Sequence, residues 1–314
     1  MRTNLVRLLA AGGILAATSL AQATPVVLAG NYLKVGISDY GTLGSDGSTE
    51  PGILHDPTGT ANFYPGGIAN DYLTPGTPHE GFSVNSDQTG FIQNDNTGYQ
   101  SFGPFGSPSL LTGAAANGYA NAASWTGSND QMSITHSYFF NPNDERILVK
   151  TTITANQDLT NLAFARSEDP DPDVNRFGSY DTNNQRGNSL YGATDFVGSA
   201  GANTGLTIGL LNGSGNTYTH NTVVDYSCCS NIDPNLVLFG DPSSAGDVSF
   251  GDYSINMAWE IGSLTKGSSA TLQYYYVFGD KIDTVGTPPV PEPETYALMF
   301  AGLATVLAIR RRKA

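Results

Sequence analysis

The feature that most constrains the fold is an alternation of apolar and polar residues that never takes on a helical period. Two such runs, Met132–Phe140 and Arg146–Ala155, flank the short segment Asn141-Pro142-Asn143-Asp144-Glu145. A period of two places every second side chain on one face of a strand, and a short turn rich in Asn, Pro and Asp joins antiparallel neighbours. These residues are therefore predicted to form a β-hairpin.

The same pattern recurs on both sides of this hairpin. Leu33, Val35 and Ile37 alternate toward one side, and so do Leu272 and Tyr274. Further strands are predicted in the segments GFSVNSDQTGFIQ, NLAFARSED, GLTIGLL, LVLFG, YSINMAWEIG and ATLQYYYVFG. Strands that follow one another at intervals of about ten residues, without helices between them, are typical of sandwiches and barrels. The sequence predicts an all-β fold, a large antiparallel β-sandwich. A division into two sub-sandwiches is the alternative.

The N-terminus has the three parts of a secretory signal. Arg2 and Arg7 provide positive charge, an apolar stretch follows, and Ala21-Gln22-Ala23 matches the small-residue pattern of a cleavage site. We expect residues 1–23 to form a signal helix that is removed after Ala23, so that the rest of the chain is exported.

The C-terminus carries a second apolar segment. Ala297–Ile309 has 13 uncharged residues and is followed at once by Arg310, Arg311, Arg312 and Lys313. A helix of this length covers about 20 Å of a hydrocarbon layer roughly 30 Å thick. Because basic residues resist crossing the membrane, the physical reading is a short, weak transmembrane anchor with a cytoplasmic basic end.

The sequence Pro291-Glu292-Pro293 stands just before that segment. This tripeptide, the apolar stretch and the terminal cluster Arg310–Arg312 together resemble the PEP-CTERM sorting signal of exported proteins in Gram-negative bacteria. The resemblance implies that an exosortase, a membrane protease-transpeptidase, cuts near Pro291-Glu292-Pro293. It also implies transient anchoring in the inner membrane and a final place at the cell surface or in an exopolysaccharide matrix. An ordinary tail anchor is the alternative.

These signals divide the chain into four parts. Residues 1–23 are the signal peptide, 24–286 the extracellular all-β domain, 287–295 a Pro-rich linker with the Pro-Glu-Pro motif, and 296–314 the hydrophobic segment with its basic tail. The prolines of the linker favour an extended chain, which holds the sorting signal away from the domain.

The charge balance limits the classes of partner. The formal net charge is −14 at pH 7, and removal of both end segments would take away several of the 14 basic residues. Such a surface repels nucleic-acid phosphate, so nucleic-acid binding is excluded as a function. It suits divalent cations and neutral exopolysaccharide.

One acidic stretch gathers Glu168, Asp169, Asp171 and Asp173 within six residues. Oxygen ligands at alternate positions are typical of calcium loops, so Asp169, Asp171 and Asp173 are candidate ligands of Ca²⁺. Two alternatives stay open: a solvated loop whose charge is balanced by the arginines Arg166 and Arg176, and a catalytic carboxylate pair formed by Glu168 and Asp169.

The only two cysteines, Cys228 and Cys229, are adjacent. An exported chain meets an oxidising compartment, which favours a disulfide between them; pairing with another chain, free thiols and a metal site are the alternatives.

The histidines give weaker signals. His136 shares the parity of apolar neighbours on its strand and is expected to be a packed or hydrogen-bonded residue. His55 with Asp56, and His79 with Glu80, are candidates for a joint metal or acid–base site, although neighbours on an extended chain point apart.

The leading functional hypothesis is a non-enzymatic structural or adhesive protein of the cell surface or biofilm matrix. The alternative is a secreted polysaccharide-binding or polysaccharide-degrading protein that uses Asp and Glu carboxylates. No nucleophile elbow, phosphate loop or zinc signature occurs in the sequence.

Overall fold

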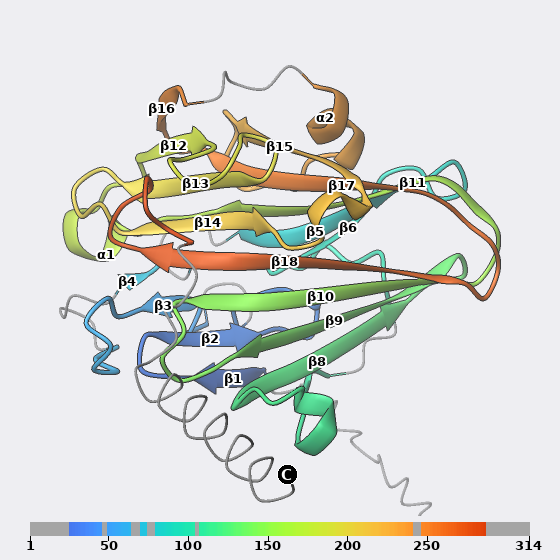
Figure 1. The fold of residues 1–314 in the computed structure, drawn as a ribbon, viewed down its shortest axis with the longest axis horizontal. Helices are drawn as coiled ribbons and strands as arrows, with labels where there is room; N and C mark the ends of the chain where they lie inside the picture. Colours follow the sequence, from blue (N-terminus) through green and yellow to red (C-terminus); the bar gives the residue numbers. More distant parts are fainter. Residues whose placement is uncertain are drawn as a thin grey trace, which may run out of the picture.

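A computed structural model describes residues 25–45, 49–63, 70–73, 79–103, 107–240 and 246–286. The strands form three sheets, and every pair of neighbours within them is antiparallel (Figure 1). The two α-helices described are short, Val174–Phe177 (α1) and Pro234–Phe239 (α2). The predicted all-β, antiparallel fold is confirmed.

The largest sheet has nine strands and forms one layer of the sandwich. Its order is β16-β12-β13-β14-β18-β10-β9-β8-β7. The bounds in that order are Val248–Gly251, Thr182–Arg186, Phe196–Gly201, Thr207–Asn212, Ser269–Gly279, Arg146–Ala155, Met132–Phe140, Asn121–Ser128 and Ser109–Leu110.

Two smaller sheets form the opposite layer. The five-stranded sheet has the order β15-β17-β11-β5-β6, with bounds Thr219–Asp225, Ser254–Leu264, Leu159–Asp169, His79–Asn85 and Ile92–Asp95. The four-stranded sheet has the order β1-β2-β3-β4, with bounds Val26–Ala29, Leu33–Ile37, Ile53–His55 and Asn70–Asp71. Single 3₁₀ turns lie at Gly113–Ala116 and Gly215–Thr217.

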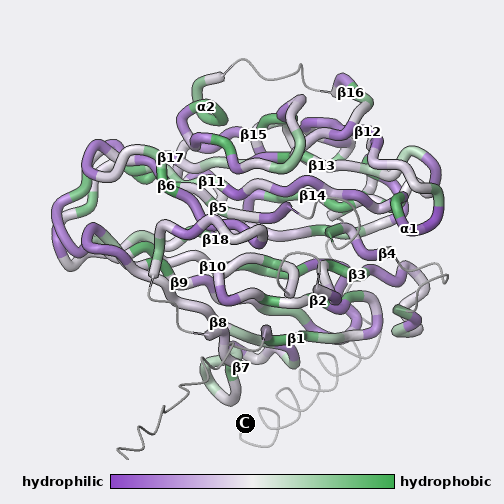
Figure 2. Tube along the Cα trace, turned by 180° about the vertical axis from the view of Figure 1, so that it is seen from behind, coloured by the Kyte–Doolittle hydropathy of each residue, from purple (hydrophilic) through white to green (hydrophobic). Residues whose placement is uncertain are grey.

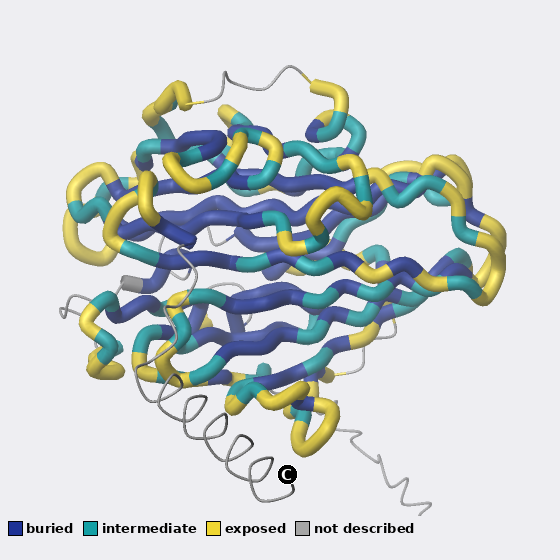
Figure 3. The backbone as a smooth tube through the Cα atoms, in the orientation of Figure 1, coloured by how far each residue is buried: buried dark blue, intermediate teal, exposed yellow. Residues whose placement is uncertain are grey.

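One hydrophobic core joins all three sheets. It includes Ile37 of β2, Phe164 and Trp259 of the five-stranded sheet, and Tyr274 and Tyr276 of β18. Buried backbone runs through the middle of the strands, whereas exposed residues gather in the connections (Figure 3). Seen from behind, the loops beyond the ends of β17 and β6 are largely hydrophilic (Figure 2). The sandwich therefore encloses a continuous apolar layer.

The central hairpin forms as the alternation predicts. Strands β9 and β10 have the predicted bounds and pair in register, with Val149 opposite Tyr138. The alternation of Leu33, Val35 and Ile37 is also confirmed, because all three side chains are buried. Tertiary packing thus agrees with local pattern at the centre of the sheet.

The segment LVLFG is a correction to the sequence analysis, because it belongs to helix α2 and not to a strand. Asp233 caps this helix by accepting a hydrogen bond from the backbone N–H of Asn235 at 2.9 Å, and Pro234 occupies the first turn. An Asp cap followed by Pro is a helix-start signal, and it outweighs four apolar residues of high strand propensity. Among the residues described, no helix is long and apolar enough to cross a membrane.

Candidate functional site

Strand β11 ends with Glu168 and Asp169, the first two residues of the acidic stretch, and sends successive side chains to opposite faces of the five-stranded sheet. Arg166 and Glu168 share the parity of Phe164, which faces the core between the sheets. Asp169 shares the parity of Ala165, which packs beneath helix α2 on the outer face. Glu168 and Asp169 therefore lie on opposite faces of the sheet, although they are adjacent in sequence.

On the inner face, Arg166 forms an ion pair with Glu80 of β5, and both side chains have 0% exposure. Arg166 Nη2 donates to Glu80 Oε2 at 2.8 Å, and Arg166 Nε donates to Tyr276 Oη at 2.7 Å. The backbone N–H of Leu43 also donates to the Glu80 carboxylate. Burial raises the pKa of Glu80, and the charge of Arg166 opposes that rise. Arg166 is therefore paired with Glu80, and its charge also acts on Glu168 of the acidic stretch. Arg176 lies over the ring of Phe177.

Glu168 lies opposite Glu80 in the pairing of β11 with β5. Both of its carboxyl oxygens are buried and make no hydrogen bond. Burial raises the pKa of Glu168 well above its usual range, and the nearby Glu80 charge adds to the effect. Glu168 is completely buried, so the structure does not place this catalytic candidate at a surface that a polymer can reach.

The three aspartates proposed as calcium ligands do not share one environment. Asp173 accepts hydrogen bonds from the backbone N–H groups of Asn203 and Thr204 and from both side chains. Burial and neighbouring carboxylates raise the pKa of Asp169 to about 7 and that of Asp171 to about 9. Asp173 is therefore engaged with the β13–β14 turn, and calcium binding by the three together stays a prediction.

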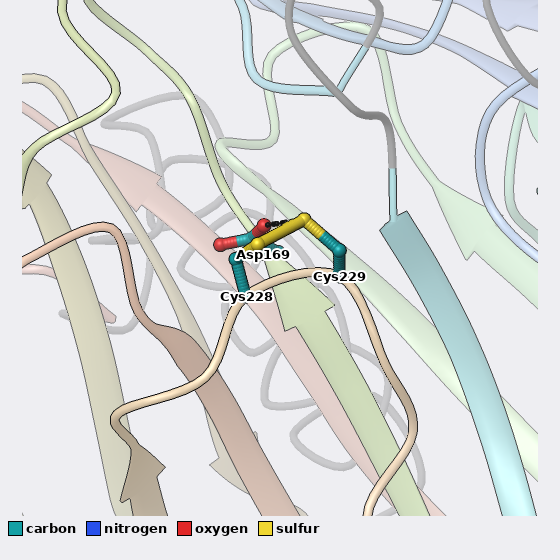
Figure 4. Close-up of side chains that lie close together, drawn as sticks. All are labelled: Asp169, Cys228 and Cys229. Atoms are coloured by element: carbon teal, nitrogen blue, oxygen red, sulfur yellow. Dashed lines mark hydrogen bonds between the residues drawn. A yellow bond between two sulfur atoms is a disulfide. The ribbon is translucent and has the colours of Figure 1, made fainter.

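Cys228 and Cys229 are joined by a disulfide in the loop between β15 and α2, beside Asp169 at the end of β11 (Figure 4). Cys229 Sγ lies 3.3 Å from Asp169 Oδ2. Within the described ranges, Asp169, Cys228 and Cys229 are the one set of His, Cys, Asp or Glu residues whose potential ligand atoms converge, all within 4.8 Å of one another.

The histidines do not form a joint site in the structure. His55 Nε2 lies 3.0 Å from Glu145 Oε1, whereas Asp56 accepts from the Thr58 backbone. His79 and Glu80 point to opposite faces of β5, as expected for neighbours on a strand. Burial lowers the pKa of His79 to about 4.

His136 is confirmed as a packed strand residue. It has 0% exposure, and its Nδ1 lies 2.8 Å from the Thr151 hydroxyl. Its ring stacks on Trp125 at a centroid distance of 5.5 Å. The residue therefore belongs to the core.

Two adjoining hollows share Arg146. One hollow, of about 240 Å³, is lined by Tyr119, Phe139, Asn141, Asp144, Arg146, Leu148 and Tyr275. The other, of about 290 Å³, is lined by Asn143, Glu145, Arg146, Phe278, Gly279, Asp280, Thr284, Val285 and Gly286. We call the first the aromatic hollow.

The aromatic hollow combines ring faces with charged and amide groups. The Arg146 guanidinium lies 5.5 Å from the centroid of the Tyr275 ring, and the Tyr119 and Phe139 rings are 5.5 Å apart. Asp144 is fixed by hydrogen bonds from the Asn141 backbone and side chain. Tyr275 projects outward because its neighbours Tyr274 and Tyr276 point into the core. The alternation of side chains along a strand is enough to predict this from the sequence. Tyr119 and Phe139 come from other segments, and nothing local in the sequence links them to Tyr275.

Hydroxyl side chains pair on the outer face of the nine-stranded sheet beyond the hollows. Thr126 and Thr135 lie 2.9 Å apart, and Thr152 and Thr271 lie 3.0 Å apart, each pair joined through the two hydroxyls. Thr154 and Ser269 continue the pattern at 2.7 Å. These six side chains are hydroxyl-bearing and uncharged, which gives this part of the sheet a neutral polar surface.

Two sets of predicted signal residues lie outside the described residues. These are Ala21 and Ala23 at the expected cleavage site, and Pro291, Glu292, Pro293, Arg310, Arg311 and Arg312 in the sorting signal.

Comparison with solved structures finds weak similarity to carbohydrate-active proteins. Heparan sulfate lyase HepC from Pedobacter heparinus is 9% identical with a TM-score of 0.36, and 63% of this chain aligns with 24% of that one. A putative kojibiose phosphorylase from the human microbiome is 11% identical, with a TM-score of 0.39 and coverages of 88% and 32%. The chain thus spans about a quarter to a third of these proteins. No curated protein matches the sequence.

The C-terminal tail gives a specific result. Residues 289–313 match the PEP-CTERM protein-sorting motif, which agrees with the resemblance in Pro291-Glu292-Pro293 and the basic end. The motif implies an exported protein, a membrane-anchoring tail before processing, and processing by an exosortase-type membrane enzyme. The chain is therefore one that carries a PEP-CTERM sorting motif at its C-terminus.

Proposed function

We propose that the chain is a non-enzymatic protein of the cell surface or exopolysaccharide matrix that binds polysaccharide through the aromatic hollow. The observation that carries the proposal is the PEP-CTERM match at residues 289–313. It supports export and release from the membrane, and the domain in front of it is then the part that acts outside the cell.

The chemistry of the hollow supports a glycan ligand. Tyr119 and Tyr275 offer ring faces on which the C–H face of a sugar can pack, and Asp144, Asn141 and Arg146 can bond its hydroxyls. The paired hydroxyls on the adjoining strands extend a neutral polar surface along the sheet. A neutral or weakly charged polymer can lie on such a face without opposing the acidic net charge of the chain.

The buried carboxylates favour binding over hydrolysis. A glycosidase needs two carboxyl groups that contact the glycosidic bond from either side. Glu80 and Glu168 have 0% exposure and lie within the core, and Glu80 is committed to Arg166. Glu80 and Glu168, the carboxyl groups on the inner face of the five-stranded sheet, are therefore not accessible to a polysaccharide. They do not support the alternative of a polysaccharide-degrading enzyme.

The test is affinity electrophoresis of the processed protein in gels that contain exopolysaccharide purified from the source bacterium. We expect the polymer to retard the protein, and we expect Tyr275→Ala and Tyr119→Ala each to lower the affinity by roughly fivefold to thirtyfold, the ~1–2 kcal/mol that truncation of an important interface side chain costs. Tyr99→Ala is the matched control, because Tyr99 is 65% exposed and lies outside the hollow. Equal retardation of all three variants and the parent would refute the assignment of the hollow, and no retardation of the parent would refute glycan binding.

A further inference from the structure

The loop that carries the disulfide is held on the five-stranded sheet by several hydrogen bonds. Ser83 Oγ donates to the Ile232 carbonyl at 2.7 Å, and Asn85 Nδ2 donates to Asp233 at 2.7 Å. Asn231 Nδ2 donates to the Asn94 carbonyl at 3.2 Å. Because these contacts follow the cysteines directly, we expect the loop to keep its place on β5 and β6 when the sulfur–sulfur bond is broken.

Three potential ligand atoms converge beneath this loop. The two sulfur atoms and a carboxylate oxygen of Asp169 all lie within 4.8 Å of one another. A sulfur atom in a disulfide has neither a proton to donate to Asp169 nor the negative charge that a metal ligand needs. Reduction gives a thiol, which has a proton to donate, or a thiolate, which has the negative charge. The 3.3 Å contact between Cys229 Sγ and Asp169 can then become a hydrogen bond, or both groups can bind the same cation.

A second observation concerns the imidazole next to this set. His79 lies directly opposite Asp169 in the pairing of β5 with β11 and is completely buried. Neither of its ring nitrogens makes a well-formed hydrogen bond, although Asn231 and Ser230 lie beside the ring. A buried imidazole without satisfied nitrogens normally has a partner. It therefore marks the site as one with unused ligand capacity.

We propose that Cys228, Cys229 and Asp169 form a redox-gated site for a thiophilic divalent cation such as Zn²⁺ or Cd²⁺. Two thiolates and one carboxylate are a ligand set that zinc accepts, and His79, which lies opposite Asp169 in the pairing of β5 with β11, is the candidate for the fourth ligand. In the oxidised chain the disulfide leaves no thiolate to bind the cation. The two cysteines are only partly buried, so a small reductant and an ion can reach them.

The opening step balances with a dithiol as the reductant. The dithiol gives two electrons and two protons to the disulfide, the sulfur–sulfur bond breaks, and the reductant leaves as its own disulfide. Binding of the cation then releases the two thiol protons as the sulfurs become thiolates. A disulfide oxidant closes the site again: it takes two electrons from the two thiolates and two protons from solvent and leaves as a dithiol, while the sulfur–sulfur bond re-forms and the ion is released. This inference does not rest on the proposed glycan function.

Cd²⁺ is the probe, because its thiolate complexes absorb in the ultraviolet. The full chain is reduced without oxygen, the reductant is removed, and Cd²⁺ is titrated into the reduced and the oxidised forms. We expect one Cd²⁺ per reduced chain, displacement by Zn²⁺, and no thiolate band in the oxidised form. Asp169→Asn keeps both cysteines, so a thiol assay of the reduced variant should still find two free thiols. Its affinity for Cd²⁺ should nevertheless be at least tenfold weaker. Asp130→Asn, at the exposed turn between β8 and β9, should bind as the parent does.

Two results would overturn the proposal. One is a reduced chain that binds Cd²⁺ no more tightly than the oxidised chain. The other is an Asp169→Asn variant whose affinity equals that of the parent, which would leave the thiols as an unassisted pair. Tryptophan fluorescence in both redox states shows whether the fold persists, since Trp125 and Trp259 are buried reporters of the core.

Discussion

Replacement of Arg166 by Met tests whether the buried ion pair organises the sandwich. Arg166 reaches Glu80 of the same sheet, Tyr276 of the nine-stranded sheet and the Gly41 carbonyl after β2. The change leaves the Glu80 carboxylate in the core without its positive partner. Breaking a buried pair in this way typically costs about 3–5 kcal/mol, a large part of the roughly 5–15 kcal/mol that stabilises a domain.

The double variant Glu80→Gln with Arg166→Met separates charge from packing. Gln removes the stranded charge while its amide oxygen still accepts from the Leu43 backbone N–H. We expect it to recover at least about 2 kcal/mol of the loss, because an uncompensated buried charge costs far more than an imperfect hydrogen bond.

The assay is urea unfolding at pH 7 followed by tryptophan fluorescence, with free energies compared at constant m-value. Lys150→Met is the matched control, since Lys150 lies on the outer face of β10 over the ring of Phe139. A loss below about 1 kcal/mol in Arg166→Met, or a double variant as unstable as the single one, would refute the reasoning.

Three further predictions follow from the other buried groups and from the tail. Burial lowers the pKa of His136 well below its usual value, so the unfolded chain binds a proton that the folded chain does not. This group alone should lower stability by about 1.4 kcal/mol per pH unit below about pH 6.5, and His136→Gln should remove that part of the pH dependence in urea titrations at pH 6.5 and 5.5, while the parts due to His79, Asp169 and Asp171 remain. Asp173→Ala should cost about 1–3 kcal/mol in buffer with a calcium chelator, because Asn203 and Thr204 lose their acceptor; a loss seen only with calcium present would instead support the calcium site. Intact mass spectrometry of the exported protein should find a chain from Thr24 to near Pro291, and a species that extends to Ala314 would contradict processing.

Local pattern predicts the strands whose two faces differ most in polarity. The hairpin Met132–Ala155 and the strand Leu33–Ile37 are of this kind, because one side of each packs on the core. Local pattern fails for helix α2, because its four consecutive apolar residues resemble a strand. The helix is predicted only when Asp233 and Pro234 are recognised as a helix start. The short strand Thr182–Arg186 (β12) is polar along its whole length, so its sequence has no alternation that predicts a strand. It is a strand because it pairs with β13 and β16.

The candidate sites are harder to predict, because their members are far apart in sequence. Glu80 and Arg166 are separated by 86 residues, and no local signal joins them. The acidic stretch looks like one site in the sequence, yet strand alternation and the turn after β11 send Glu168, Asp169 and Asp173 to three different neighbourhoods. The proximity of Asp169 to Cys229 depends on how the loop after β15 folds back over β11.

The position of the aromatic hollow has a consequence for how the protein could be retained in a matrix. Tyr275 lies on a strand whose neighbours Tyr274 and Tyr276 are locked in the core, so its ring is held by the rigid part of the sandwich. A preorganised ring loses little conformational freedom on binding, but a single shallow hollow buries few atoms of a polymer. Each contact should therefore be weak and exchange quickly. Because a polysaccharide repeats the same unit many times, strong retention would then depend on chains linked or crowded along one polymer, through effective concentration, and not on tight binding at one site.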